Sequence, residues 1–139
     1  MEIEITITPQ PIDSAGSLPQ GLVGAAGALV EFAGVVRGEE NDQAIAALEY
    51  EAYEPMAGRV MREILDDLGQ RHPCLWAQVI HRVGVVPVGE CAIRVRAAAG
   101  HREQAFALVM EFMNRLKQDV PIWKCRALRA PDQPNRARP

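Results

Sequence analysis

Polar and apolar residues alternate with a period of two from Glu2 to Thr8, a pattern typical of a β-strand. Runs rich in β-branched and other apolar residues predict further strands at 27–37, 44–53, 76–83, 91–99 and 122–129. The polar segment 38–43 has the length and composition of a turn, so we expect the strands on either side of it to form a hairpin. A second turn, which contains Pro87 and Gly89, separates the strands expected at 76–83 and 91–99.

Two segments carry the hydrophobic period of an α-helix. The first follows Pro55, which suits the first turn of a helix, and is expected to end near 69–73. Its apolar positions are Met56, Val60, Ile64, Leu65 and Leu68. The second begins after Gly100 and ends before Pro121, because the residue before a proline is pushed out of the helical region. Its broad apolar stripe consists of Ala105, Phe106, Leu108, Val109, Phe112, Met113 and Leu116.

This order of elements predicts a single α+β domain over residues 1–130, with a mixed or antiparallel sheet and two main helices. Between the first two strands, several prolines and a glycine leave room for at most a short helix near 14–22. The tail 131–139 is rich in proline and arginine and is expected to be disordered.

Composition narrows the classes of function. The 139 residues are 48% hydrophobic and 24% charged, which is ordinary for a soluble globular domain. A net charge of −3 argues against broad nucleic-acid binding, and no apolar run approaches the roughly 20 residues of a membrane span. The acidic, alternating N-terminus is unlike a signal peptide. The three cysteines have no CxxC spacing, so we expect reduced thiols in the cytoplasm and neither a metal site nor a cofactor.

Only two of the fifteen basic residues are lysines, Lys117 and Lys124. Arginine stays protonated in proteins, whereas a desolvated lysine can lose its proton and act as a base or a nucleophile. The chain is expected to reverse between the second helix and the last strand, so both amines can reach one region. Alternatively, Lys117 complements the helix dipole and Lys124 protects an edge strand from aggregation.

Three other basic residues are candidate anion ligands. His101 and Arg102 stand at the expected start of the second helix, where free backbone N–H groups favour a phosphate or a carboxylate. Alternatively, Arg102 pairs with a neighbouring acid on a solvated face. Arg37 ends a strand just before an acidic loop, and it is either a third ligand of the anion or a partner of that loop. His81 and Arg82, inside a strand, are expected to be structural.

Several segments together resemble the catalytic (large) subunit family of molybdopterin synthase, from molybdenum-cofactor biosynthesis. The resemblance covers essentially the whole chain as far as Arg126. Its strongest piece is V-P-I-W-K at 120–124, preceded by an H-R-x-x-A-F segment at 101–106. The matching segments, in family order, are G-A-L-V-E-F-A-G-V-V-R (27–37), L-E-Y-E-A-Y-E-P-M-A (48–57), V-I-H-R-V-G (79–84), V-G-E (88–90), H-R-E-Q-A-F (101–106) and L-K-Q-D-V-P-I-W-K (116–124).

The resemblance implies a fold and a reaction. The fold would be an α/β-hammerhead with an added antiparallel sheet. The enzyme would convert cyclic pyranopterin monophosphate into molybdopterin by installing a dithiolene. Sulfur would arrive as a thiocarboxylate on the C-terminal Gly-Gly of a small ubiquitin-like subunit. Two large subunits would form a homodimer within a heterotetramer.

The resemblance also assigns roles to residues of this sequence. Lys117 and Lys124 match the family's catalytic lysines, and Arg37, His101 and Arg102 match its anion-binding residues. We expect Lys117 to lie near the thiocarboxylate carbonyl, where it polarises that group or acts as a base or nucleophile. Lys124 is expected to stabilise charge on the pterin.

Two features depart from the family pattern. Arg126 stands where the family usually has a glutamate, and it either adds charge near the lysines or contacts the substrate. The family's tail commonly continues through a G-x-x-W-V-like segment, so here that wall of the site is expected to be shorter or supplied by a partner. Two alternatives therefore stay open: a non-catalytic module that binds a ubiquitin-like partner or a pterin phosphate, and an unrelated phosphate-binding protein that uses the helix start at His101.

Overall fold

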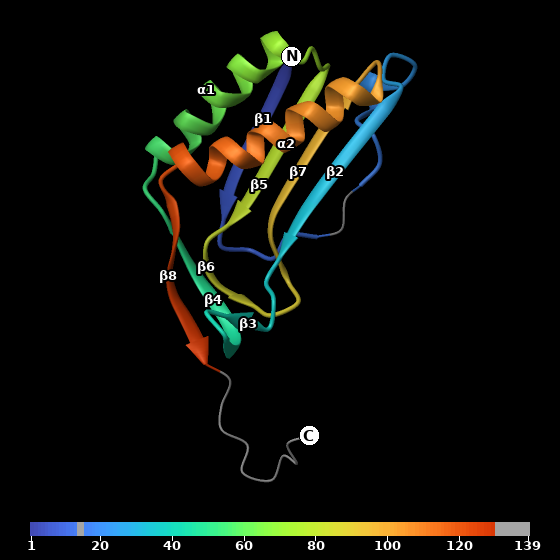
Figure 1. Cartoon of the computed structure of the whole chain (residues 1–139). Helices are drawn as coiled ribbons and strands as arrows, with labels where there is room; N and C mark the ends of the chain where they lie inside the picture. Colours follow the sequence, from blue (N-terminus) through green and yellow to red (C-terminus); the bar gives the residue numbers. More distant parts are fainter. Residues whose placement is uncertain (14–15, 130–139) are drawn as a thin grey trace.

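The computed structural model describes residues 1–13 and 16–129 (Figure 1). The tail predicted at 131–139, and residues 14–15 of the predicted short helix, lie outside the described residues. The elements are β1 (Glu2–Thr8), the 3-10 helix η1 (Gln20–Leu22), β2 (Ala28–Val35), β3 (Glu39–Glu40), β4 (Gln43–Ala52), α1 (Met56–Arg71), β5 (Trp76–Arg82), β6 (Gly84–Pro87), β7 (Cys91–Ala99), α2 (Arg102–Asp119) and β8 (Ile122–Arg129). The expected α+β class with two main helices is confirmed.

The larger sheet has the strand order β1-β5-β7-β2 and is mixed. β1 runs parallel to β5, whereas β5 and β2 run antiparallel to β7. Helices α1 and α2 cover one face of this sheet (Figure 1). Each buries one apolar stripe in the main core, and the buried residues are Ala57, Met61, Ile64, Leu65 and Leu68 of α1 and Ala105, Leu108, Val109, Phe112 and Leu116 of α2. This packing sets the position of both ends of α2 over the sheet.

The opposite face of the larger sheet carries the chain that connects β1 to β2. Two buried arginines of β7 hold this connection, because their side chains alternate with the core residues of the strand. Arg94 donates to the backbone carbonyl of Asp13, and Arg96 donates to that of Gly16 at 3.0 Å. The guanidinium of Arg96 also lies over the ring of Trp76, 5.0 Å from its centroid. On this face, charge anchors a connecting segment to the sheet.

A smaller sheet is built around β4, which pairs antiparallel with both β6 and β8. β3 adds a short hairpin with β4, and its turn residues Asn41 and Asp42 have φ angles of 51° and 62°. Positive φ at both central residues is what a tight two-residue hairpin turn requires. Ile45 and Leu48 of β4 pack with Val86 of β6 in a second, smaller core.

The predicted hairpin between 27–37 and 44–53 is wrong. β2 pairs with β7 in the larger sheet, whereas β4 lies in the smaller one. The two strands face different cores, since Val30 packs against the main core and Leu48 belongs to the smaller one. β6 is absent from the predicted elements, because four residues that include a proline look like part of a turn.

Candidate active site

Lys117 and Lys124 line one cavity of about 410 Å³, here called the lysine cavity. Lys117 lies in the last turn of α2, which ends where Val120 takes up an extended conformation. The chain reverses at this point, and the backbone N–H of Ile122 donates to the carbonyl of Val120 at 2.8 Å. β8 then runs back along β4 and carries Lys124 to the same cavity. The reversal brings together two amines that are seven residues apart in the sequence.

The walls of the lysine cavity come from both sheets and from α2. The other lining residues are Phe32, Gly34 and Val35 of β2, Tyr50 of β4, His81 of β5, Ala92 and Ile93 of β7, Met113 and Leu116 of α2, and Ile122 and Trp123 of β8. Most of these side chains are apolar, whereas both lysines are exposed at the opening. A group that enters the cavity would leave water and meet two amines, which strengthens every charge interaction there.

The two lysines differ in their contacts. The Nζ atom of Lys124 lies 3.1 Å from Oε2 of Glu40, on the short strand β3. In the part of the chain that the structure describes, no carboxylate lies within 4.0 Å of the amine of Lys117. Lys124 is therefore held by a carboxylate, and Lys117 is the amine that can turn toward an incoming group. Glu40 was not predicted as a site residue from the sequence, because the acidic loop that contains it was considered only as a partner of Arg37.

Two neutral polar side chains, Tyr50 and His81, also reach the lysine cavity. Their rings meet edge to face, with centroids 5.5 Å apart and planes at 69°. Burial lowers the pKa of His81, while burial and the charge of Glu40 raise the pKa of Tyr50. Both rings are therefore uncharged near pH 7.

His81 and Arg82 lie on opposite faces of β5, and they have different surroundings. Arg82 points away from the lysine cavity and pairs with Glu90 at 2.7 Å, so it has the structural role that was expected. His81 was expected to be structural as well, yet it lines the lysine cavity. Adjacent side chains on a strand point to opposite faces, so this alternation could have predicted that His81 and Arg82 have different surroundings.

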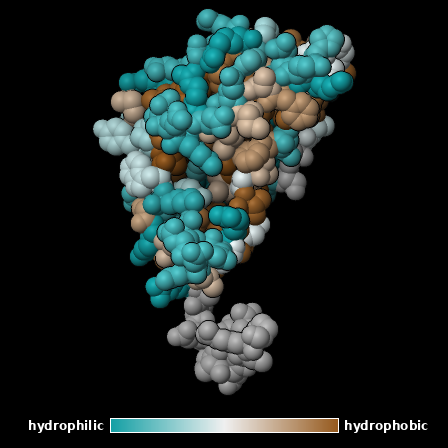
Figure 2. Space-filling model, in the orientation of Figure 1, coloured by the Kyte–Doolittle hydropathy of each residue, from teal (hydrophilic) through white to brown (hydrophobic). Residues whose placement is uncertain are grey.

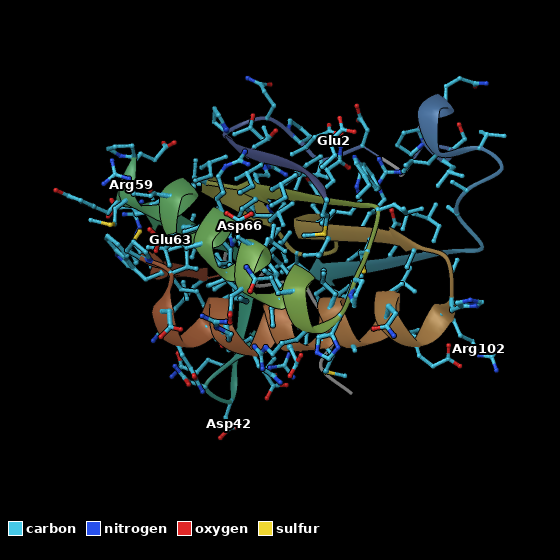
Figure 3. The ribbon with its side chains drawn as sticks, turned by 90° about the horizontal axis from the view of Figure 1, so that it is seen from above. Glu2, Asp42, Arg59, Glu63, Asp66 and Arg102 are labelled. Carbon is cyan, nitrogen blue, oxygen red and sulfur yellow. The ribbon has the colours of Figure 1, made fainter. Side chains whose placement is uncertain are left out.

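Arg37, His101 and Arg102 do not reach the lysine cavity within one chain. Arg37 lines a separate depression beside the β3–β4 turn. Figure 3 shows Arg102 at one end of α2. His101 precedes the helix and Lys117 lies in its last turn, so roughly 22 Å of helix separates Arg102 from Lys117. The guanidinium of Arg102 is exposed and lies 3.9 Å from the carboxylate of Glu103, as in the alternative weighed from the sequence. One copy of the chain therefore does not assemble the expected anion cradle.

Comparison with known proteins gives the family. The sequence model of the MoaE protein family matches residues 7–119. The chain belongs to the MoaE protein family. It is 35% identical over 124 residues to the molybdopterin synthase catalytic subunit of Aspergillus niger, an overlap that covers 89% of this chain and 69% of that protein. The corresponding subunit of Bacillus subtilis is 36% identical over 118 residues, or 85% of this chain and 75% of that protein.

A solved structure agrees with this assignment. The crystal structure of molybdopterin synthase from Staphylococcus aureus matches the MoaE-family chain described here with a TM-score of 0.76 and 28% identity. The match covers 91% of this chain and 90% of that one. Both the family resemblance drawn from the sequence motifs and the α+β architecture are confirmed.

Arg126, the departure from the MoaE-family pattern noted above, has its charge balanced within the smaller sheet. Its Nε and Nη2 atoms each lie 2.9 Å from Oε1 of Glu49 on β4. It lines a shallow depression beside Lys124 and Glu40, outside the lysine cavity. Arg126 therefore does not bring an uncompensated charge to the two lysines.

The described residues of this MoaE-family chain show neither a candidate metal site nor an activated thiol at Cys74 or Cys91. Within residues 1–13 and 16–129, no three histidine, cysteine, aspartate or glutamate side chains gather in a way that could hold a metal ion. Burial raises the pKa of Cys74 to about 11 and also raises that of Cys91, so both thiols are poor nucleophiles near neutral pH. Neither described helix has an apolar stretch long enough to cross a membrane.

Proposed function

We propose that this chain is the catalytic subunit of a molybdopterin synthase. It converts cyclic pyranopterin monophosphate into molybdopterin, with sulfur from the thiocarboxylate at the C-terminal Gly-Gly of a small ubiquitin-like subunit. The observation that carries the proposal is the convergence of Lys117 and Lys124 on one mainly apolar cavity. The names of the relatives that share the family support it. We place the reaction in the cytoplasm, in keeping with three cysteines that are all free thiols.

The contacts of the two lysines suggest how they divide the work. Lys117 has no carboxylate partner among the described residues, so its amine can approach the thiocarboxylate carbonyl and polarise it or act as base or nucleophile. Lys124, which is paired with Glu40, is placed to stabilise negative charge on the pterin. A Gly-Gly tail has no side chains beyond hydrogen, so its terminal carbonyl can come close to the lysines that line the cavity.

A homodimer would supply the anion ligands that one chain lacks. Phe106 and Met110 are 59% and 64% exposed on α2, and apolar side chains gather over α2 and β2 in Figure 2. Met110 is close to the midpoint between Arg102 and Lys117. If two copies of α2 pack antiparallel about a twofold axis at this point, Arg102 and His101 of one copy approach Lys117 of the other.

Mixing variants tests this arrangement. Lys117→Ala and His101→Ala chains, each of low activity alone, should regain activity when mixed, because a mixed dimer contains one intact site. If each chain instead formed the whole site by itself, mixing would restore no activity.

Sedimentation of a Met110→Glu variant tests the dimer interface. The variant should be monomeric, and a persistent dimer would place the interface elsewhere.

Reconstitution tests the reaction itself. Purified chain, cyclic pyranopterin monophosphate and a thiocarboxylated small subunit should together yield the dithiolene product. The alternative of a non-catalytic module predicts that a Gly-Gly-tailed partner binds while no product forms. That outcome would remove the enzyme assignment and keep the binding surface.

A further inference from the structure

Among the residues that the structure describes, only one of the two ring nitrogens of His81, Nδ1, makes a hydrogen bond. It is 5% exposed on β5, a strand paired on both sides, with Ile7 and Ile93 as its neighbours across the sheet. Its Nδ1 atom lies 2.8 Å from the backbone carbonyl oxygen of Arg82. A carbonyl oxygen only accepts hydrogen bonds, so Nδ1 carries the ring proton and Nε2 of the neutral ring carries a lone pair.

This tautomer is set by the surrounding structure. The guanidinium of Arg82 donates to Glu90 at 2.7 Å and to the carbonyl of Val85 at 3.4 Å, on the other side of the sheet. Those contacts and the pairing with β1, in which the N–H of Val83 donates to the carbonyl of Thr8 at 2.9 Å, hold the peptide whose oxygen His81 binds. Burial lowers the pKa of the ring, which keeps it neutral at physiological pH. His81 therefore offers a fixed acceptor and not a cation.

His81 lines a cavity that contains few other polar groups. Apart from Lys117 and Lys124, the side chains that line the lysine cavity and carry a hydrogen-bonding group are His81, Tyr50 and the indole of Trp123. A small number of placed polar groups in an apolar pocket is what orients a ligand. While protonated, the two amines can only donate, so N–H or O–H groups of a ligand are left to the acceptors in the cavity wall, the Nε2 atom of His81 and the hydroxyl of Tyr50.

We propose that His81 is a substrate-binding residue whose Nε2 accepts a hydrogen bond from an N–H or O–H group of the ring system that enters the lysine cavity. The inference rests on the proposed function, in which that ring system is the pyranopterin, whose fused rings carry several N–H groups. The lysines then meet the charged or carbonyl parts of the reactants, and His81 selects for a ring that can donate. Tyr50, packed against His81, fixes the tilt of the imidazole.

Two substitutions separate this role from that of an ordinary core histidine. Asparagine places an amide N–H near the position of Nδ1 and can keep the bond to the Arg82 carbonyl, but it has nothing at Nε2. Glutamine places an amide oxygen near Nε2 and loses the Nδ1 donor. Binding of cyclic pyranopterin monophosphate is measured by calorimetry without the small subunit, so that no turnover occurs. We expect His81→Asn to weaken binding about tenfold and His81→Gln to weaken it no more than about threefold.

The opposite ranking of thermal stability is expected, because His81→Gln loses the internal bond. Wild-type affinity in His81→Asn, or equal losses of affinity in the two variants, would overturn the inference.

An NMR measurement on the wild-type chain tests the inference independently. The ¹⁵N signal of unprotonated Nε2 should shift when the precursor is added. If the precursor binds and this signal does not change, the inference is also overturned. If the wild-type chain does not bind the precursor at all, the proposed function itself fails.

Discussion

Two cavities of nearly equal volume, about 410 and 420 Å³, lie against opposite faces of the edge strand β2. The lysine cavity contains Phe32 and Gly34 from one face of the strand, and the arginine cavity, which contains Arg82 and Arg94, includes Glu31 from the other. Their volumes do not distinguish them. What distinguishes them is how far the positive charge in each is already balanced by the protein.

In the arginine cavity each guanidinium has a carboxylate or carbonyl partner, although the Nε atoms of Arg82 and Arg94 have no hydrogen-bond partner among the described residues. Arg82 pairs with Glu90 at 2.7 Å, and Arg94 donates to the Asp13 carbonyl and lies 3.8 Å from Glu31. In the lysine cavity one amine has Glu40, and the other has no carboxylate partner among the described residues. Balanced cations fasten the chain to the sheet, whereas a cation without a partner is available to a ligand. Charge balance is therefore a better guide to the site than cavity size.

Removal of either lysine should give the largest effect. We expect Lys117→Ala and Lys124→Ala each to lower kcat by at least about a hundredfold, because each removes a group that acts on developing charge or on a proton. Both side chains are exposed, so the melting temperature should hardly change. Product formation and thermal melts of the same samples check this. Wild-type turnover in either variant would remove that lysine from the mechanism.

Arg94→Met should show the reverse behaviour. The variant loses the bond to the Asp13 carbonyl and the contact with Glu31, so its free energy of unfolding should fall by about 2 kcal/mol. Turnover should stay near the wild-type value, since Arg94 lies on the other face of the sheet. Urea unfolding measures the loss, with exposed Arg62→Met as a control that should change stability by less than about 0.5 kcal/mol. If Arg94→Met kept wild-type stability but lost turnover, the arginine cavity would have a functional role and not a structural one.

Glu40→Gln tests the carboxylate that pairs with Lys124. The substitution keeps the shape and removes the charge that holds the Lys124 amine at 3.1 Å, so kcat should fall about fivefold while KM changes little. Glu39→Gln is the matched control, because Glu39 is the exposed neighbour on the same strand. Steady-state kinetics of the two variants should separate them. Equal losses of kcat in the two variants would show that the overall charge of the loop, and not the contact of Glu40 with Lys124, affects turnover.

The smallest effect concerns pH. Burial lowers the pKa of His81 in the folded chain below its ordinary value of 6.5, so the unfolded chain binds the proton more readily. The free energy of unfolding should therefore fall as pH drops from 7.5 to 5.5. The His81→Gln variant lacks the imidazole, so its free energy of unfolding should fall less over the same pH range. Parallel slopes in urea titrations of the two proteins would show that His81 does not contribute.

Parts of this structure follow from local patterns in the sequence. The stripe from Ala105 to Leu116 predicts α2, and Pro121 predicts the reversal that brings the lysines to one cavity. The rarity of lysine points to Lys117 and Lys124 without any knowledge of the fold. These features depend on helix period and proline geometry, which act over a few residues.

Other parts depend on which surfaces meet after folding. No local pattern shows that β2 and β4 face different cores, so the hairpin between them was predicted wrongly. Glu40 reaches Lys124 across 84 positions of sequence, and His81 enters the cavity only because β5 lies between β1 and β7. His101 directly precedes the helix whose last turn carries Lys117, and their separation comes from the length of that helix.

β8 has a consequence for control of the reaction. Among the described strands it is paired with β4 alone, and it contributes Lys124 to the cavity. Detachment of this strand would leave the strand pairing of the larger sheet in place, would remove the contact of Ile122 with the main core, and would take Lys124 away from the cavity. In the proposed reaction, a chain whose β8 is not paired with β4 would lack one of the two lysines at the cavity and would not consume an activated sulfur donor.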